Sequence, residues 1–365
     1  MVERLPYTQN VVGSNPAPPT KIMFNNVNQW SESARHLLVS FPRGSSVTFP
    51  TTHSCQVPHR SLVVDLNGDC FLCECDAWLP VTVGKITDFA TLGEVWNSAT
   101  AKEIQTDIDQ KKYTHCAVKH CGILEKDIVR PRFTVSINID ESCNLQCPTC
   151  RSSSIFHKSG EVYNRKLAQV QHLVTLINEF PHPLDIVVSG NGDPLASLIM
   201  RPLIINWKPK PNQKMKLFTN GLLLKKLLAN SSILSSIDNY RISVDAGSPE
   251  VYSVVRFPGN FSVLRENLSW LSENKLSTAQ VSLLCCVSSM NVHDIKNFAQ
   301  LCTEYGFIGT LTKVNDWHTL NNFNEFNVAD NPDHPLYSAL VDQLTEVSKL
   351  PNIFLGSCLS NLVRH

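Results

Sequence analysis

The chain of 365 residues lacks a long apolar segment, and this absence excludes several classes of protein. No run approaches the roughly 20 apolar residues that a membrane-spanning helix needs, and residues 281–287 are only long enough for a buried strand. The first residues also show no apolar core of a secretory signal peptide. We therefore expect a cytoplasmic protein that has no membrane partner.

The sequence also lacks an excess of either charge, because 32 Lys and Arg residues balance 32 Asp and Glu residues. Neither extended basic runs nor stripes of alternating basic and aromatic residues occur, so nucleic acid is not expected as a partner. No internal repeat is apparent. The length exceeds that of a usual single core, which predicts one large domain and a smaller one.

Cysteine, in contrast, is abundant, with thirteen residues. Without an export signal this number indicates metal ligation rather than disulfides, and the odd total means that at least one thiol is not paired. Cys143, Cys147 and Cys150 have the spacing C-x3-C-x2-C. Three thiolates at this spacing leave one position of a cubane iron–sulfur cluster open. A zinc site completed by a distant ligand, or chance clustering, are the alternatives.

The region from Arg132 to Asp330 alternates strand-like with helix-like segments. The predicted strands are residues 133–139, 184–189, 215–219, 240–244, 280–287 and 310–314. The first intervening helix has Leu167, Val170, Val174 and Ile177 on one face, and later helices are expected at 222–228, 261–271 and 294–305. Six such units predict a parallel sheet with right-handed crossovers but are too few to close an eight-stranded barrel. The fold class is therefore α/β, with an open, partial (β/α)6 TIM-like barrel.

Polar motifs follow the ends of the predicted strands, where α/β folds place their chemistry. The three cysteines follow the first strand. A turn of small residues follows the second strand, and such residues allow the main chain to approach a ligand closely, although the same sequence also suits an ordinary glycine turn. The candidate residues after the second, third, fourth and sixth strands are Ser189, Gly190, Asn191, Gly192, Asp193, Asn220, Ser243, Asp245, Arg256 and Asn315.

Together these motifs resemble the radical S-adenosylmethionine (SAM) superfamily. The turn at 189–194 is similar to the family's Gly-Gly-Glu-Pro turn, and the endings at 218–221 and 243–250 are similar to its Thr-Asn-Gly and Ser-hydrophobic-Asp endings. The resemblance implies that SAM binds the open iron of a [4Fe-4S] cluster on the three cysteines and contacts the polar residues named above. One electron would then cleave SAM, and the resulting 5′-deoxyadenosyl radical would remove a hydrogen atom from the substrate. Thr149 and Asp193 depart from the family's usual aromatic residue and glutamate.

A second group of cysteines lies in the N-terminal third. Cys55 and Cys73 form a C-x12-G-x4-C element around a predicted hairpin that turns at residues 67–68, and a helix is expected at 92–109. This region resembles the SPASM domain or its shorter twitch form, which implies an auxiliary [4Fe-4S] cluster on Cys55, Cys73, Cys116 and Cys121. The module precedes the barrel here, whereas the family usually places it after the barrel. Cys70, Cys75 or a nearby histidine remain open as substitute ligands, and a zinc-ribbon-like staple remains an alternative.

The resulting organisation is an N-terminal extension (1–50), a SPASM- or twitch-like domain (51–128), a radical SAM barrel (129–330) and a C-terminal helix with a tail (331–365). The resemblance implies a radical SAM oxidoreductase that performs a two-electron oxidation, either of an alcohol or of a peptide side chain to form a crosslink. Its partners would be a reductase, flavodoxin or ferredoxin as electron donor and a small-molecule or peptide substrate. A radical SAM methyltransferase, a protein-activating or maturing enzyme, and a non-enzymatic metal-binding scaffold are the alternatives. Cys285, Cys286 and Cys302 fit buried positions and are interpreted as core thiols.

Overall fold

The computed structural model describes residues 55–73, 79–116, 131–151, 153–207, 209–315 and 322–363. All of these residues belong to one compact unit. The N-terminal extension predicted at 1–50 lies outside the described residues, as do Cys75 and Cys121. No helix in the described ranges combines the length and the apolar character that a membrane span requires.

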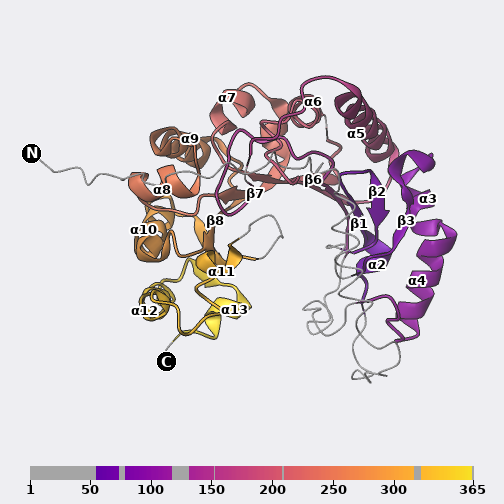
Figure 1. Ribbon diagram of the computed structural model, residues 1–365. Helices are drawn as coiled ribbons and strands as arrows, with labels where there is room; N and C mark the ends of the chain where they lie inside the picture. Colours follow the sequence, from indigo (N-terminus) through magenta and orange to yellow (C-terminus); the bar gives the residue numbers. More distant parts are fainter. Residues whose placement is uncertain are drawn as a thin grey trace, which may run out of the picture. The chain divides into compact units, whose positions relative to one another are not determined.

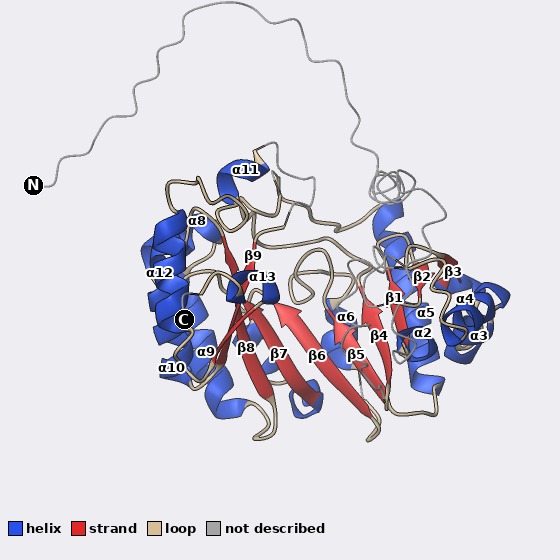
Figure 2. Ribbon diagram, turned by 90° about the horizontal axis from the view of Figure 1, so that it is seen from below, coloured by secondary structure: helices blue, strands red, loops and turns tan. Residues whose placement is uncertain are grey.

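One ten-stranded sheet organises the described chain, with the strand order β10-β9-β8-β7-β6-β5-β4-β1-β2-β3 (Figures 1 and 2). Strands β4 to β9 run parallel in chain order, and their bounds are Phe133–Ile137, Leu184–Val188, Gln213–Thr219, Ile237–Ser243, Gln280–Val287 and Ile308–Lys313. Each of the six predicted strands is therefore present within a few residues of its expected place. The sheet does not close on itself, which confirms the α/β class and the open, partial barrel.

Two additions extend this sheet beyond the six predicted strands. Strand β10 (Ile353–Leu355) pairs in parallel with β9. On the other side, β1 (Ser61–Val64) pairs in parallel with β4 and continues into the antiparallel strands β2 (Asp69–Phe71) and β3 (Thr82–Lys85). The predicted hairpin is thus confirmed, with Gly68 at φ +79° in its turn, a backbone angle that glycine adopts at little cost. Strands β1, β2 and β3 of the N-terminal region therefore belong to the same continuous sheet as the barrel strands.

Helices α5, α7, α9 and α10 follow the outer side of the curved sheet (Figure 1). The helices that join the barrel strands are α5 (Glu161–Glu179), α6 (Arg201–Asn206), α7 (Leu224–Leu228), α8 (Pro249–Val255), α9 (Phe261–Asn274) and α10 (Ile295–Tyr305). The remaining α-helices are α2 (Val57–Arg60), α3 (Leu92–Asn97), α4 (Ala99–Asp109), α11 (Phe323–Phe326), α12 (Tyr337–Val347) and α13 (Ser357–Ser360). Short 3-10 turns lie at η1 (Ile86–Asp88), η4 (Ser232–Ser236) and η5 (Val292–Asp294).

The helix predicted at 92–109 is in fact two helices that meet at Ser98. Ser98 has an extended backbone (φ −61°, ψ 156°), and its hydroxyl accepts a hydrogen bond from the main-chain N–H of Ala101. A serine in this conformation caps the first turn of α4, so it ends one helix and begins the next. The prediction of a single helix was wrong because the hydrophobic pattern continues across the cap.

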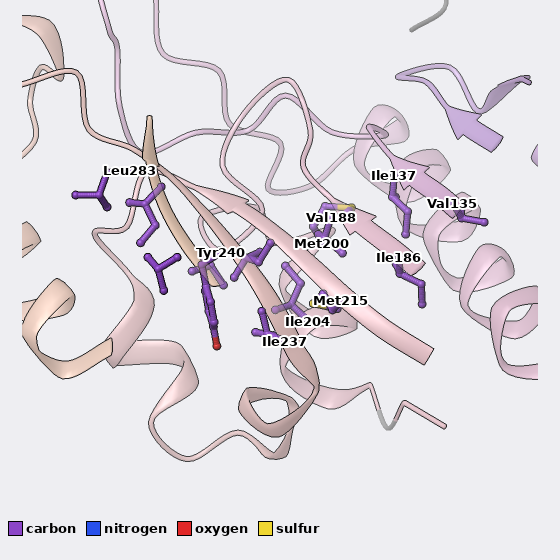
Figure 3. Packing of buried hydrophobic residues seen from close by; sticks show 14 of the residues in the cluster. Val135, Ile137, Ile186, Val188, Met200, Ile204, Met215, Ile237, Tyr240 and Leu283 are labelled. Carbon is purple, nitrogen blue, oxygen red and sulfur yellow. The ribbon is translucent and has the colours of Figure 1, made fainter. Parts of the chain in front are cut away.

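The core lies between the sheet and the outer helices, because alternate side chains of a strand point to opposite faces. The buried set from β4, β5 and β6 comprises Val135, Ile137, Ile186, Val188, Met215 and Leu217, and Met200 and Ile204 pack against it (Figure 3). The intervening side chains, such as Ser136 and Asp185, are half-buried on the inner face of the sheet. The loops at the carboxyl ends of the parallel strands therefore meet beside an open inner face.

Candidate functional site

The three cysteines of the C-x3-C-x2-C motif lie on the loop that follows β4. Cys147 is buried, Cys143 is half-buried and Cys150 is exposed. The N–H of Cys150 donates to the carbonyl of Cys147 (2.9 Å), which makes a tight turn between the second and third thiols. The N–H of Cys143 donates to the carbonyl of Ile155 (3.1 Å) and so closes the loop at its base. The loop is thus a structured element of the carboxyl end of the sheet.

Hydrogen-bond donors and cations surround these sulfur atoms. Asn220 Nδ2 lies 4.0 Å from Cys143 Sγ, and Arg256 Nη1 lies 3.7 Å from Cys147 Sγ. Burial raises the pKa of Cys143 to about 11, and it raises the pKa of Cys147 although Arg256 opposes the shift. Burial alone would lower the pKa of Arg151, but the nearby thiolates of Cys150, Cys143 and Cys147 raise it. All three sulfurs therefore share one cationic neighbour, and a bound metal would further favour their thiolate form.

The turn after β5 packs main chain against main chain on the cysteine loop. The N–H of Asp193 donates to the carbonyl of Ser142 (2.9 Å). A Cβ atom at Gly192 would lie 2.2 Å from that same carbonyl oxygen and 2.5 Å from the carbonyl oxygen of Glu141, so only glycine fits at this position. Gly190 has φ +113°, which also favours glycine. The predicted turn is therefore adjacent to the predicted cluster ligands.

Both carboxylate oxygens of Asp193 accept hydrogen bonds from other residues of the chain. Its Oδ1 accepts from the N–H groups of Leu195 (3.0 Å) and Ala196 (3.1 Å), and its Oδ2 accepts from Thr219 Oγ1 (2.8 Å) and the N–H of Asn220 (2.6 Å). Burial raises its pKa, although these four hydrogen bonds oppose the shift. The carboxylate ties the turn after β5 to the end of β6, and it thereby positions Asn220.

Two asparagines join the strand ends, the turn after β5 and the cysteine loop by hydrogen bonds. Asn138 Oδ1 accepts from Ser189 Oγ (3.0 Å) and from the N–H of Gly190 (3.2 Å), which joins the end of β4 to the turn. Asn220 Nδ2 donates to Asn144 Oδ1 (2.8 Å) in the cysteine loop. Asn191 is exposed, and its carbonyl accepts from Arg151.

The guanidinium group of Arg256 forms an ion pair with the carboxylate of Asp245. Arg256 Nη2 lies 2.7 Å from Asp245 Oδ2, and Asp245 Oδ1 accepts from the N–H of Cys286 (2.7 Å). The Nε of Arg256 is buried without a hydrogen-bond partner. One donor of its fork is thus left for a ligand, while the other two nitrogens hold the Cys147 sulfur and Asp245.

The remaining predicted residues lie at the ends of neighbouring strands. Ser243 is half-buried at the end of β7, and Asn315 is exposed just after β9. Cys286 differs from its interpretation as a core thiol. It is half-buried on the inner-face side of β8, because it alternates with the buried Cys285. Burial raises the pKa of Cys286 to about 12, and the nearby charges of Asp245 and Cys150 act in the same direction.

The N-terminal cysteines lie in a different environment. Cys73 is buried within the hydrophobic cluster, and the half-buried Cys55 and Cys116 pack against that cluster. Cys70 is fully buried, and its pKa is strongly raised by burial and by the carboxylates of Asp65, Asp69 and Asp88. Because metal ligation requires a thiolate, these surroundings disfavour Cys70 as a ligand.

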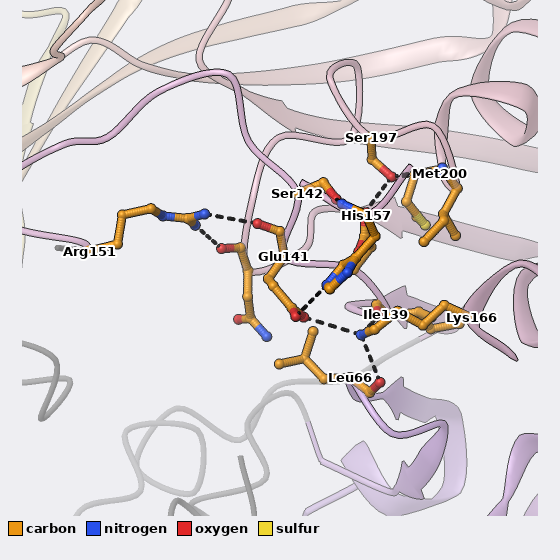
Figure 4. A network of polar contacts seen from close by, with 12 residues as sticks. Leu66, Ile139, Glu141, Ser142, Arg151, His157, Lys166, Ser197 and Met200 are labelled. Atoms are coloured by element: carbon orange, nitrogen blue, oxygen red, sulfur yellow. Dashed lines mark hydrogen bonds and ion pairs between the residues drawn. The ribbon is translucent and has the colours of Figure 1, made fainter. Parts of the chain in front are cut away.

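A polar network beside the cysteine loop was not predicted from the sequence (Figure 4). Lys166 of α5 is almost fully buried, and its Nζ donates to the carbonyls of Leu66 (3.0 Å) and Ile139 (2.6 Å) and to Glu141 Oε2 (3.1 Å). Glu141 Oε1 lies 2.7 Å from His157 Nε2. Burial would raise the pKa of Glu141, but Lys166 and His157 lower it. The network links the N-terminal hairpin to the start of the cysteine loop.

The residues present fit the cofactors that the motif implies. Three thiols on one loop share a cation, the glycine turn leaves no room for a side chain against the loop, and Arg256 retains an unpartnered buried donor. Three thiolates with a fourth position open suit a cluster that binds a small molecule.

Two family models match the chain. The model described as "Radical SAM superfamily" matches residues 137–302, and the model of the SPASM family, described as "Iron-sulfur cluster-binding domain", matches residues 55–122. The two matches account for both cysteine groups. Their order along the chain, with the SPASM match first, is the order expected from the sequence.

Curated relatives match about half of the chain. The mycofactocin maturase MftC of Mycolicibacterium smegmatis is 28% identical over 174 residues, which cover 47% of this chain and 42% of that protein. The probable GTP 3′,8-cyclase of Methanocaldococcus jannaschii is 25% identical over 178 residues, which cover 48% of this chain and 56% of that protein. The matches thus span about half of the length of these relatives.

Among solved structures, Streptococcus suis SuiB bound to the precursor peptide SuiA is 14% identical. The alignment covers 71% of this chain and 62% of SuiB, with a TM-score of 0.43.

Proposed function

We propose that this chain, which belongs to the radical SAM superfamily and carries a SPASM domain ahead of the barrel, catalyses a net two-electron oxidation of its substrate. The observation that carries the proposal is the convergence of three thiols, the glycine turn and Arg256 at the carboxyl ends of the parallel strands. An alcohol carbon or a peptide side chain that becomes crosslinked is the proposed site of oxidation.

Cys143, Cys147 and Cys150 would hold a [4Fe-4S] cluster with one open iron. SAM would contact the turn at Ser189–Asp193, together with Asn220, Ser243, Asp245, Arg256 and Asn315. When bound, the cluster and SAM would supply a 5′-deoxyadenosyl radical that takes a hydrogen atom from the substrate.

The chain's own residues would position these groups. Asp193 and Asn138 hold the turn and the strand ends in place through six hydrogen bonds to main-chain and hydroxyl groups. The Nε of Arg256 is free to donate to the carboxylate of SAM, because the pair with Asp245 fixes the rest of the guanidinium. Arg151 offsets the negative charge of the thiolates.

The auxiliary cluster is proposed on Cys55, Cys73 and Cys116, with Cys121 beyond the described residues. The SPASM match spans all four of these positions. Because β1 pairs with β4, the region that holds the auxiliary cysteines is fixed against the strand from which the cysteine loop emerges. A group at that place is suited to accept the electron that a substrate radical must lose in a two-electron oxidation.

The substrate would bind along the inner face of the sheet. This face carries Lys216, which pairs with Asp185 (3.2 Å), and Arg241, whose guanidinium lies 5.1 Å from the centre of the Phe218 ring. Charged and aromatic groups suit a polar substrate, such as a peptide or a phosphorylated or carboxylated small molecule. The relatives are named a mycofactocin maturase and a probable GTP 3′,8-cyclase, so their names point to more than one class of substrate. A flavodoxin, ferredoxin or reductase would supply the electron.

The test is the iron and sulfide content of the anaerobically reconstituted protein, measured together with dithionite-driven SAM cleavage. We expect about eight irons per chain and formation of 5′-deoxyadenosine. Cys143→Ala should abolish cleavage, whereas Cys73→Ala should spare uncoupled cleavage and impair substrate oxidation.

Three outcomes would count against parts of the proposal. About four irons with cleavage would leave the barrel site standing and make the N-terminal cysteines a zinc site or staple. Transfer of the SAM methyl group to the product would favour a methyltransferase. A folded protein that binds no iron–sulfur cluster and cleaves no SAM would mean that the assignment as an enzyme is wrong.

A further inference from the structure

Asp140, Glu141 and His157 gather three metal-ligating side chains beside the cysteine loop without using a thiol. One ligand atom from each residue lies within 4.8 Å of the others, a combination of carboxylate and imidazole donors in one place. Asp140 and Glu141 lie three and four residues after the end of β4, and His157 lies seven residues after the last of the three cysteines. The group is therefore distinct from the thiols, although it lies on the same loop.

Each carboxylate has one oxygen held by a neighbour and the other turned toward His157. Ser197 Oγ donates to Asp140 Oδ2 (2.6 Å), and Lys166 Nζ donates to Glu141 Oε2 (3.1 Å) (Figure 4). The second oxygens, Asp140 Oδ1 and Glu141 Oε1, lie 4.0 and 2.7 Å from His157 Nε2, and the shorter contact is a hydrogen bond that a metal ion would replace with loss of its proton. Carboxylates that bind a metal through one oxygen have their other oxygen held in this way by surrounding residues.

The surroundings of Asp140 Oδ1 give a second, independent indication that a ligand binds here. Asp140 is 2% exposed, and this oxygen has no hydrogen-bond partner in the structure. A buried carboxylate oxygen without a partner is unfavourable, because it has lost its water and gained nothing in exchange. It faces the imidazole nitrogen at a distance too long for a hydrogen bond but short enough for both atoms to share one ion.

We propose that Asp140, Glu141 and His157 bind a divalent transition metal ion. One imidazole nitrogen and two carboxylate oxygens suit Zn²⁺ or Mn²⁺, and water would complete the coordination. The local charge agrees, because Lys166 pairs with the carboxylate of Glu141, whereas the described contacts of Asp140 include no ammonium group. Arg151 donates to the carbonyls of Glu141 and Asn191.

The ion would fix the two ends of the cysteine loop to one another. At present the ends are joined by the Cys143–Ile155 main-chain bond and by the bond from the N–H of His157 to Ser142 Oγ (2.9 Å). A metal ion bound by residues 140, 141 and 157 would add a third connection between the two ends of the loop, made by side chains. The ion would thus hold the loop in place without touching substrate or cofactor.

The experiment uses the full chain with its iron–sulfur sites reconstituted, so that the thiols are occupied. The protein is dialysed against Zn²⁺ or Mn²⁺, and bound metal is measured by elemental analysis, independently of SAM cleavage. We expect one tightly bound ion per chain beyond iron, with only nitrogen and oxygen neighbours in the zinc X-ray absorption spectrum. His157→Gln and Asp140→Asn should each weaken binding by more than about tenfold.

The control is His293→Gln, which replaces an exposed histidine of η5, outside both cysteine regions. This variant should bind the ion like the unaltered protein. Circular dichroism must show that His157→Gln, which replaces a half-buried side chain, remains folded. The proposal is overturned if the unaltered protein takes up no ion beyond iron, or if both folded variants retain full affinity. It is also overturned if sulfur appears among the zinc neighbours in protein whose iron content shows that both cysteine groups already carry clusters.

Discussion

The thiols of the loop after β4 and the thiol of Cys70 in the hairpin differ in the charges that surround them. The loop after β4 faces its thiols with Arg151, Arg256 and the amide of Asn220. At the hairpin, Cys70 is instead surrounded by carboxylates and is fully buried. Burial raises the pKa of Cys143, Cys147 and Cys70 alike, but Arg151 and Arg256 favour the thiolates of the loop, whereas carboxylates disfavour that of Cys70. A count of cysteines therefore does not identify a metal site. In the hairpin these surroundings disfavour Cys70 as a ligand.

The sharpest test of this contrast is a pair of cysteine substitutions. Cys147→Ala should reduce SAM cleavage to background, because it removes one of three ligands, whereas Cys70→Ala should leave cleavage and iron content near those of the unaltered protein. Cleavage assays and iron analysis on both reconstituted variants would decide the matter. Loss of iron from Cys70→Ala would show that the carboxylate surroundings do not exclude a ligand.

A glycine substitution tests how closely the cysteine loop depends on the turn after β5. Gly192→Ala should lower the free energy of unfolding by about 3 kcal/mol, because its Cβ would collide with two main-chain carbonyls. Gly93→Ala in α3 is the control, since the nearest atom to its added Cβ is a side-chain oxygen at 3.7 Å. Denaturant unfolding measures both. Equal stability of the two variants would contradict the close packing.

Lys166 connects the two regions, so its removal should affect both. Lys166→Met should cost about 2 kcal/mol of unfolding free energy, because two buried carbonyls and Glu141 lose their donor. Hydrogen exchange should rise both in the hairpin turn at Leu66 and in the loop after Ile139. Faster exchange in only one of the two places would mean that the lysine does not couple them. Lys226→Met, which replaces an exposed lysine of α7, is the control.

The smallest expected effect concerns pH. The pKa of Glu141 is lowered in the folded protein, so its contribution to stability is present above the unfolded pKa of glutamate and is lost as the pH falls through the folded value. Glu141→Gln should therefore lose less stability than the unaltered protein between neutral and acidic pH. Unfolding curves at both pH values measure this, with Glu179→Gln on the exposed end of α5 as control. Identical pH dependence in all three proteins would refute the role of Glu141.

The strands and the strand-end motifs could be predicted because both depend on local sequence. Alternation defines each strand, and parallel topology then brings its carboxyl end beside the others, which is why the cysteine loop, Gly192 and Asn220 meet. The buried face of α5 could not be predicted in the same way. Hydrophobic spacing favoured Leu167 and Val174, which are only half-buried, whereas Lys166 and Gln169 are buried.

The reason lies in partners that are distant in the sequence. Lys166 and Gln169 donate to the carbonyls of Leu66 and Asn67, which lie about one hundred residues earlier in the chain. No local pattern reports such a contact. The same applies to Asp140, Glu141 and His157, whose grouping depends on how the cysteine loop returns to the end of β4.

The parallel pairing of β1 with β4 has a consequence for any attempt to isolate the barrel. Residues 61–64 cover the hydrogen-bonding flank of β4 over four residue pairs. A fragment that begins at residue 131 would leave β4 as a bare edge strand, with unpaired N–H and C=O groups next to apolar side chains. Such an edge recruits other chains, so the fragment would aggregate or form β-paired dimers. The N-terminal region that carries the cysteines thus covers the edge strand β4 of the barrel, whatever metal it binds.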